Sequence, residues 1–115
     1  MRGMILALML ASPSVAVAED WQTLTGADIS TALTTRVLGY DGGEMQNFFA
    51  DGRTLYEVKG GESWGKWRVE GDQFCSVWPP SDHWGCFDVQ RDGAGRSLRF
   101  MGSDGAVSVG MYADE

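Results

Sequence analysis

The chain has few of the residues that carry catalysis or metal binding. It contains one histidine, His83, and two cysteines, Cys75 and Cys86, among 115 residues. Structural zinc usually takes four cysteine or histidine ligands, so this set is too small for such a site. Ser81-Asp82-His83 superficially resembles a catalytic triad, but triad members converge from separate segments rather than from one turn. We therefore expect no enzyme, no metal and no cofactor.

Basic residues are also scarce. Lys and Arg number 9 against 16 Asp and Glu, which gives a formal net charge of −7. Binding of nucleic acid or an anionic membrane needs a basic surface, so neither is expected as a partner. Basic proteins and neutral ligands remain possible. The hydrophobic content of 43% is too high for a disordered chain, and the length suits one domain.

No apolar run is long enough to cross a membrane. The run Met4–Ala11 is broken by Ser12-Pro13-Ser14, whereas a spanning helix needs about 20 apolar residues. Arg2 before this run and Ala16-Val17-Ala18 after it are typical of a secretory signal peptide. We predict a signal peptide over residues 1–18 and one domain over residues 19–115, without a membrane anchor, in the periplasm or secreted.

The predicted export of the protein indicates the oxidation state of its two cysteines. An oxidising compartment favours a disulfide between Cys75 and Cys86. Glycine is abundant, at 16 residues against 3 prolines, and this favours tight turns and a β-rich fold. One helix is expected over residues 24–35, where Thr25 can cap the N-terminus. Its apolar stripe should comprise Ala27, Ile29, Ala32 and Leu33.

Three turn signals predict hairpins and their registers. Asp51-Gly52 reads as a two-residue turn that places Phe49 opposite Thr54, Phe48 opposite Leu55 and Asn47 opposite Tyr56. Gly71-Asp72 pairs Glu70 with Gln73 and Val69 with Phe74. A turn at Pro80-Ser81 sets Trp78 opposite His83, Val77 opposite Trp84 and Cys75 opposite Cys86. Directly opposed residues on antiparallel strands are close enough for a disulfide.

Alternation assigns the faces of these strands. The face expected to form the core contains Trp67, Val69, Phe74, Ser76, Trp78, Phe87 and Val89. The face expected to meet solvent, with the disulfide on it, contains Lys66, Arg68, Cys75, Val77, Trp84, Cys86 and Asp88. Further on, Val107, Val109 and Met111 alternate with Ser108 and Gly110.

These elements add up to a mainly β fold. We predict an antiparallel up-and-down meander of about seven strands that forms a small barrel or half-barrel, with the short N-terminal helix over one opening. The five tryptophans and other large aromatics favour an interior filled by side chains. A monomer is expected.

Two tryptophans are harder to bury in this register. Trp64 and Trp84 either cover the barrel rim and the disulfide or offer an exposed surface for a ligand or a protein. We take Trp64, Trp84 and the turn residue His83 as candidate ligand-binding residues.

The segment Gly65–Cys75 (GKWRVEGDQFC), followed by Trp84-Gly85-Cys86-Phe87, resembles a family of small exported proteins of Gram-negative bacteria that are classified as domains of unknown function. The resemblance extends to the helix start Leu24–Ile29 and the turn Phe48–Arg53, and covers about residues 21–105. It implies a lipocalin-like β-barrel and a disulfide between the two cysteines. It implies no known activity.

The expected function is that of an exported, non-catalytic binding module. Its partner would be a small apolar or glycan ligand, or an envelope protein, held at the barrel mouth and by Trp64 or Trp84. The alternative is an inhibitor of a basic periplasmic hydrolase such as lysozyme or a protease. That alternative rests on the acidic net charge and on a likeness in architecture to periplasmic inhibitors.

Overall fold

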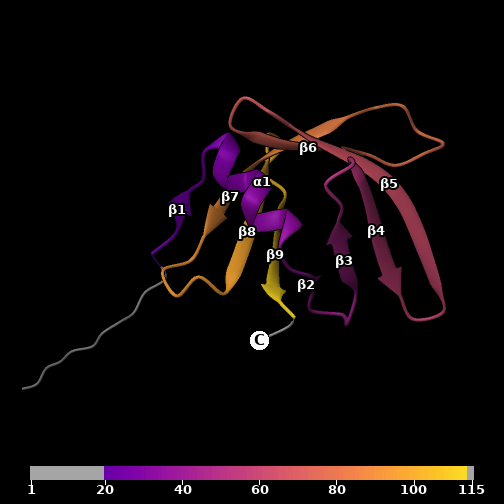
Figure 1. Cartoon of the computed structure of the whole chain (residues 1–115), viewed down its shortest axis with the longest axis horizontal. Coiled ribbons are helices and arrows are strands. Elements are labelled where there is room, and N and C mark those ends of the chain that lie inside the picture. Colours follow the sequence, from indigo (N-terminus) through magenta and orange to yellow (C-terminus); the bar gives the residue numbers. More distant parts are fainter. Residues whose placement is uncertain (1–19, 114–115) are drawn as a thin grey trace, which may run out of the picture.

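The structure is a computed structural model of the chain, and it describes residues 20–113. The predicted signal peptide, residues 1–18, lies outside the described residues. The described part forms one helix and nine strands, shown in Figure 1. In chain order they are β1 (Gln22–Thr23), α1 (Gly26–Thr34), β2 (Leu38–Gly39), β3 (Met45–Phe48), β4 (Arg53–Val58), β5 (Gly61–Glu70), β6 (Gln73–Val77), β7 (Gly85–Arg91), β8 (Ser97–Gly102) and β9 (Val107–Tyr112).

Eight of these strands close into an antiparallel up-and-down barrel. From β2 to β9 each strand pairs with the next one along the chain, and β2 also pairs with β9 through Leu38 and Tyr112. The ninth strand, β1, pairs with the end of β7. The predicted fold class is confirmed. The prediction of about seven strands missed β1 and β2, because two residues are too few to show an alternation.

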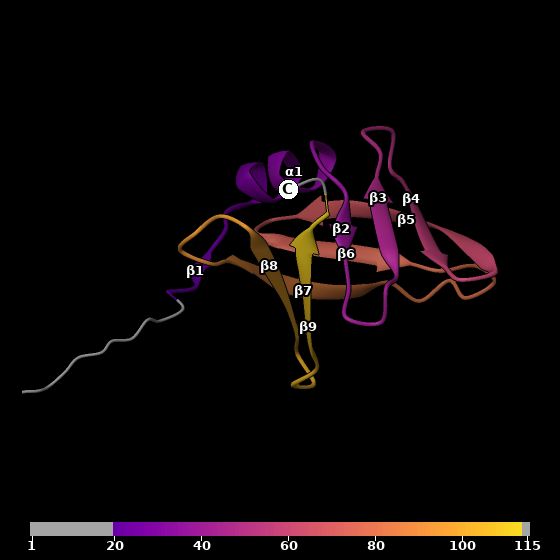
Figure 2. The same cartoon turned by 90° about the horizontal axis from the view of Figure 1, so that it is seen from below.

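Helix α1 covers one end of the barrel, as predicted. It begins after the N-cap Thr25, and it buries Ile29, Ala32 and Leu33, whereas Ala27 is exposed. α1 contacts β3, β5 and β6, and the backbone N–H of Gly26 donates to Oδ1 of Asp72 in the β5–β6 turn at 2.8 Å. Figure 2 shows α1 opposite the turns that join β2 to β3 and β8 to β9. The helix therefore leaves the other end of the barrel uncovered.

The hairpin of β3 and β4 differs from its predicted register by one residue. Phe48 pairs with Thr54 and Gln46 pairs with Tyr56. The turn has three residues instead of two, because Gly52 takes a left-handed conformation (φ 96°) and its N–H donates to the carbonyl of Phe49 at 3.0 Å. A type I turn followed by a left-handed glycine is the usual three-residue hairpin. The shift places Tyr56 on the same face as Gln46, inside the barrel.

The other two hairpins agree with the prediction near the disulfide. Glu70 pairs with Gln73 and Cys75 pairs with Cys86, which form a disulfide with a Cα–Cα distance of 4.0 Å. The predicted turn at Pro80-Ser81 is wrong, because the turn begins earlier: the N–H of Ser81 donates to the carbonyl of Trp78 at 3.1 Å. The β6–β7 pairs end at Ser76 and Gly85. The expected pairing of Trp78 with His83, and of Val77 with Trp84, is therefore not part of this ladder.

The predicted inner face is confirmed and the outer face needs one correction. Trp67, Phe74, Ser76 and Val89 are buried, and Val69, Trp78 and Phe87 are partly buried. On the outer face Lys66, Arg68 and Asp88 are exposed, whereas Cys75 and Val77 are buried. A small outer layer forms over this part of the sheet, because the Arg68 guanidinium lies 3.9 Å from the ring centre of Trp84 and also pairs with Glu70.

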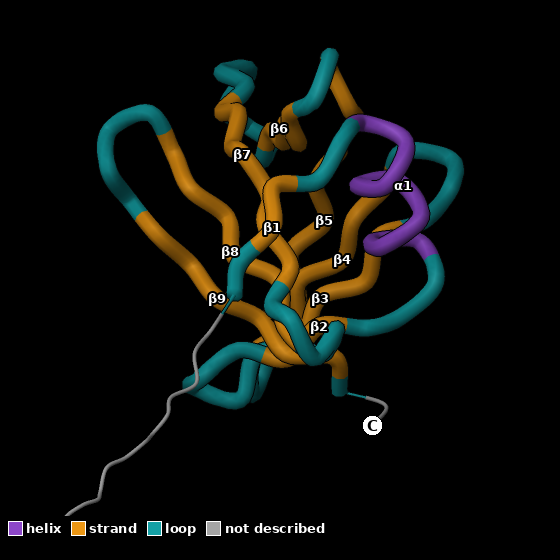
Figure 3. The backbone as a smooth tube through the Cα atoms, turned by 90° about the vertical axis from the view of Figure 1, so that its left-hand side faces the viewer, coloured by secondary structure: helices purple, strands orange, loops and turns teal. Residues whose placement is uncertain are grey.

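Strand β9 reverses the usual distribution of apolar residues. Ser108 and Gly110 lie opposite Phe100 and Leu98, which are buried. Gly110 is itself buried, whereas Ser108 is exposed near the turn of the hairpin. Val107, Val109 and Met111 on the other face are 44–56% exposed, and Val109 also borders the hollow at the uncovered end of the barrel. Figure 3 shows that the turn of the β8–β9 hairpin points away from α1.

Candidate ligand-binding site

The interior is filled by the core beneath α1, but the prediction of a filled interior does not hold at the uncovered end of the barrel, where an open cavity of about 500 Å³ lies. Two small side chains are part of its lining, the buried Ser76 on β6 and the exposed Ser108 on β9. We call this space the barrel cavity. Its lining residues are Tyr40, Asp41, Gly42, Glu44, Gln46, Phe48, Tyr56, Phe74, Ser76, Trp78, Phe87, Phe100, Ser108 and Val109.

The inner part of the barrel cavity is aromatic. Phe74 packs against three other lining rings, with centroid distances of 5.7 Å to Phe48, 6.2 Å to Phe87 and 5.4 Å to Phe100. Tilted and edge-to-face arrangements such as these are the favourable ones for aromatic pairs. These rings are also part of the hydrophobic core that includes residues of α1, so the core forms the apolar inner wall of the cavity.

Three further rings stand nearer the uncovered end, and we call Tyr40, Tyr56 and Trp78 the mouth aromatics. The Tyr40 and Tyr56 centroids are 6.1 Å apart, and those of Tyr56 and Trp78 are 6.2 Å apart. Tyr40 lies at the end of β2, Tyr56 on β4, and Trp78 directly after β6. The three rings thus come from separate parts of the barrel wall and meet at its mouth.

A chain of hydrogen bonds holds one side of the mouth. The Tyr40 hydroxyl donates to Oε1 of Gln46 at 2.7 Å, and Nε2 of Gln46 donates to Oγ1 of Thr54 at 2.9 Å. The Thr54 hydroxyl in turn donates to the carbonyl of Asn47 at 2.7 Å. Buried polar groups are stable when satisfied in this way. The network fixes the orientation of the Tyr40 ring.

The hydroxyl of Ser76 is outside this hydrogen-bond network. Its side chain is nine-tenths buried and lines the barrel cavity. Its hydroxyl has no hydrogen-bond partner among residues 20–113. A buried hydroxyl without a partner is unfavourable unless water or a ligand satisfies it. Ser76 is therefore a polar group that can contact a molecule in the cavity.

Two acidic residues lie at one side of the mouth, in the connection between β2 and β3. Asp41 and Glu44 line the barrel cavity, whereas none of the lining residues is Lys, Arg or His. Burial, with a smaller contribution from Tyr56, raises the pKa of Tyr40 far above its usual value. Burial and the nearby Glu44 carboxylate also raise the pKa of Tyr56. Both phenols are consequently neutral hydrogen-bonding groups throughout the physiological pH range.

A second hollow adjoins the barrel cavity and has a volume of about 550 Å³. It shares Gln46, Tyr56 and Trp78 with the cavity and is completed by Ser63, Trp64 and Pro79. Trp64 is 45% exposed and stacks on Phe49, and the Arg53 guanidinium lies 5.2 Å from the Trp64 ring centre. Of the three candidate binding residues named from the sequence, Trp64 alone lines either space.

The other two candidates lie away from the cavity. Trp84 is half-buried on the outer face under Arg68. His83 is exposed in the β6–β7 loop, where its backbone N–H donates to Oγ of Ser81 at 3.1 Å. A ligand-binding role for Trp64, Trp84 and His83 stays a prediction. Sequence reasoning missed Tyr40, Tyr56 and Gln46, and it placed Trp78 on the inner face without assigning it to a site.

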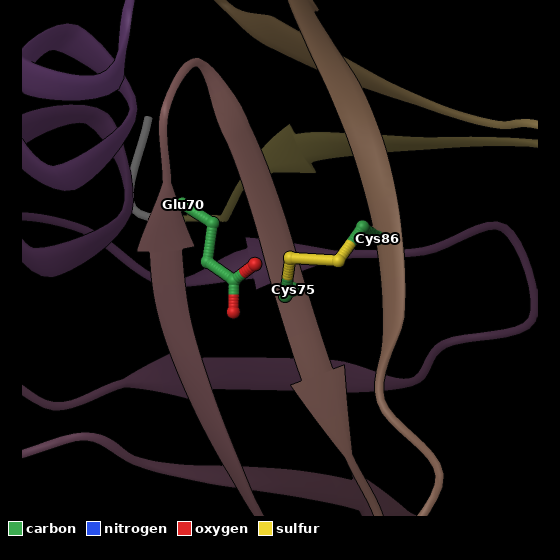
Figure 4. Close-up of side chains that lie close together, drawn as sticks. All are labelled: Glu70, Cys75 and Cys86. Carbon is green, nitrogen blue, oxygen red and sulfur yellow. A yellow bond between two sulfur atoms is a disulfide. The ribbon is translucent and has the colours of Figure 1, made fainter.

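One group of possible metal ligands lies on the outer face. Figure 4 shows Glu70 beside the disulfide of Cys75 and Cys86. The two sulfurs are bonded to each other at 2.04 Å, so neither is a thiolate, and Glu70 pairs with Arg68. While the disulfide is intact, these three side chains are therefore part of the outer layer of the sheet.

The barrel cavity offers apolar contact, neutral hydrogen-bonding groups and two carboxylates. These groups suit noncovalent binding of a small molecule. Within residues 20–113, no helix is both long and apolar enough to cross a bilayer. Comparisons with protein-family models, with curated proteins and with solved structures find no match, so the resemblance noted from the sequence stays a prediction.

Proposed function

We propose that this protein is a binding module that holds a small, largely apolar molecule in the barrel cavity. The observation that carries the proposal is an open, ring-lined space of about 500 Å³ that contains the Ser76 hydroxyl, which has no hydrogen-bond partner in the described part of the chain. Ligand sites in proteins are typically clefts of about 300–1,000 Å³ with apolar walls and a few convergent polar groups. The cavity matches this description in volume and in chemistry.

The proposed place of action is the periplasm or the exterior of the cell. Two observations support it: the signal-like pattern of residues 1–18 and the disulfide between Cys75 and Cys86. Disulfides of this kind persist in oxidising compartments. Mass spectrometry of the exported protein should find a chain that begins at Glu19. An intact Met1 in the exported fraction would contradict the proposal.

A fluorescent dye tests the binding function without knowledge of the natural ligand. N-phenylnaphthylamine is neutral and apolar, and its emission rises when it leaves water. We expect saturable binding to the purified protein. Ser108→Phe should weaken this binding, because Ser108 lines the cavity, whereas Val107→Phe, at an exposed residue of β9 that does not line it, should not. Absence of saturable binding, or equal binding by both variants, would contradict a cavity site.

Inhibition of a basic hydrolase stays the alternative. The formal net charge of −7 supports it, because opposite charges steer association of proteins. Such a complex should weaken strongly as ionic strength rises, whereas a neutral dye in an apolar cavity should be insensitive to salt. Binding of lysozyme that depends strongly on salt and survives Ser108→Phe would favour the alternative.

A further inference from the structure

The charged side chains that line the barrel cavity are all acidic. Its lining includes the carboxylates of Asp41 and Glu44 and no positively charged side chain. Glu44 is held in place at the mouth, since its Oε1 accepts from the N–H of Gly42 at 3.1 Å. An anionic ligand would meet these carboxylates without a countercharge. A neutral or cationic ligand is therefore favoured.

The mouth aromatics provide a second feature that distinguishes a cation from a neutral molecule. A cation within about 6 Å of a ring centre is attracted by the negative face of the ring. Tyr40, Tyr56 and Trp78 are neighbours at centroid distances of 6.1 and 6.2 Å, so one small cation at the mouth can contact more than one ring. Such groups of rings bind quaternary ammonium ions and methylated amines.

Elsewhere in the protein, arginine side chains lie over the faces of aromatic rings. Arg36 lies 3.8 Å from the ring centre of Tyr112, Arg68 lies 3.9 Å from Trp84, and Arg99 lies 4.3 Å from Trp21. Arg53 lies over both Phe49 and Trp64. Within residues 20–113 no Lys or Arg lies over a mouth aromatic in this way. These three rings thus have no cation of their own.

The rings are also held in position before any ligand arrives. The Tyr40 hydroxyl donates to Gln46, and Trp78 lies against Gly65, where an added Cβ would come within 2.6 Å of Cε3 of the indole. A preorganised site loses less entropy when a ligand binds. The inner wall of phenylalanines beyond the mouth is apolar and suits an uncharged body attached to the cation.

We infer that the ligand of the barrel cavity is an organic cation, an amine or quaternary ammonium group with an apolar body. The charged group lies among Tyr40, Tyr56 and Trp78 beside Glu44, and the apolar body lies against Phe74, Phe87 and Phe100. This inference rests on the proposed binding function and names its ligand class.

The test compares two molecules of the same shape. Benzyltrimethylammonium and neopentylbenzene differ in having a quaternary nitrogen or a quaternary carbon at the same position. Displacement of bound N-phenylnaphthylamine measures the affinity of both. We expect the cation to bind about tenfold more tightly. Equal affinity, or tighter binding of neopentylbenzene, would overturn the inference and leave the proposed function standing.

Variants assign the preference to the mouth. Glu44→Gln should weaken binding of the cation by about threefold to tenfold and leave neopentylbenzene unchanged. Glu62→Gln removes the same charge from the exposed start of β5, outside the cavity, and should change neither affinity. An equal effect of both variants would overturn the inference. If neither molecule displaces the dye the inference also fails, and if the dye itself does not bind, the proposed function fails with it.

Discussion

The rings of Tyr56 and Trp78 meet edge to face at the uncovered end of the barrel, with centroids 6.2 Å apart and planes at 74°. Both rings line the barrel cavity and the second hollow, so their positions set the width of the mouth. Tyr56 is placed by its pairing with Gln46, and Trp78 by its contact with Gly65. Backbone register and one glycine therefore determine the shape of the candidate site.

Gly65→Ala tests the contact that positions Trp78. The added Cβ would lie 2.6 Å from Cε3 of Trp78 and 2.8 Å from the carbonyl oxygen of Val77, so both the ring and the backbone of β6 must move. We expect the free energy of unfolding in urea to fall by about 1–3 kcal/mol. Gly61→Ala, on the same strand with open space around its Cβ, should change it by less than about 0.5 kcal/mol. Similar values for the two variants would contradict the described packing.

Ser76→Ala tests whether the cavity hydroxyl is free. We expect the free energy of unfolding to be unchanged, or to rise by up to about 1 kcal/mol, because no hydrogen bond within residues 20–113 is lost. Thr54→Val is the comparison, since its buried hydroxyl contacts Gln46 and the Asn47 carbonyl, and it should lose about 1–3 kcal/mol. A loss of that size for Ser76→Ala would show that its hydroxyl has a structural partner.

The disulfide should contribute to stability without affecting the cavity. It closes a loop between residues 11 positions apart, which in the chain-entropy model stabilises the fold by about 3 kcal/mol. Addition of a reductant should lower the free energy of unfolding by about this amount. The double variant Cys75→Ala/Cys86→Ala serves as the control, because its stability should not respond to the reductant. An unchanged value for the reduced parent protein would contradict the prediction.

Alkaline pH should destabilise the protein partly through Tyr40. Burial raises the pKa of Tyr40, with a smaller contribution from Tyr56, so the folded chain keeps this proton at a pH where the unfolded chain has lost it. The stability that this group contributes is present below about pH 10, the pKa of an unperturbed tyrosine, and is lost as the pH rises above it. Urea unfolding at increasing pH should show a smaller alkaline loss in Tyr40→Phe. An identical pH dependence in the two proteins would be inconsistent with this assignment.

The parts of the fold that were predictable from the sequence are those with a local cause. The turn at Gly71-Asp72 set the β5–β6 register, the N-cap Thr25 set the start of α1, and the cysteine pairing followed from opposed positions on β6 and β7. Each of these depends on a short stretch of residues. A local sequence pattern was therefore sufficient to predict these three features.

The barrel cavity was not predictable in this way. An additional residue in the β3–β4 turn decides whether Tyr56 shares a face with Gln46 or with Asn47, and Asp51-Gly52 is compatible with both turns. The count of large aromatics favoured a filled interior, whereas the structure leaves an open space at one end of the barrel, with Ser76 and Ser108 among the lining residues. The residues that line the space depend on how the whole barrel closes, and a local sequence pattern does not predict this closure.

The tryptophan side chains allow the most direct test of the cavity as the binding site. The chain has five tryptophans, and each indole N–H gives its own signal in a two-dimensional ¹H–¹⁵N NMR spectrum, assignable by substituting one tryptophan at a time. On titration with benzyltrimethylammonium, the account predicts that the Trp78 signal shifts in a saturable way while that of Trp84 on the outer face stays constant. A shift of Trp84 with Trp78 unchanged would contradict the central claim and place binding on the outside of the barrel.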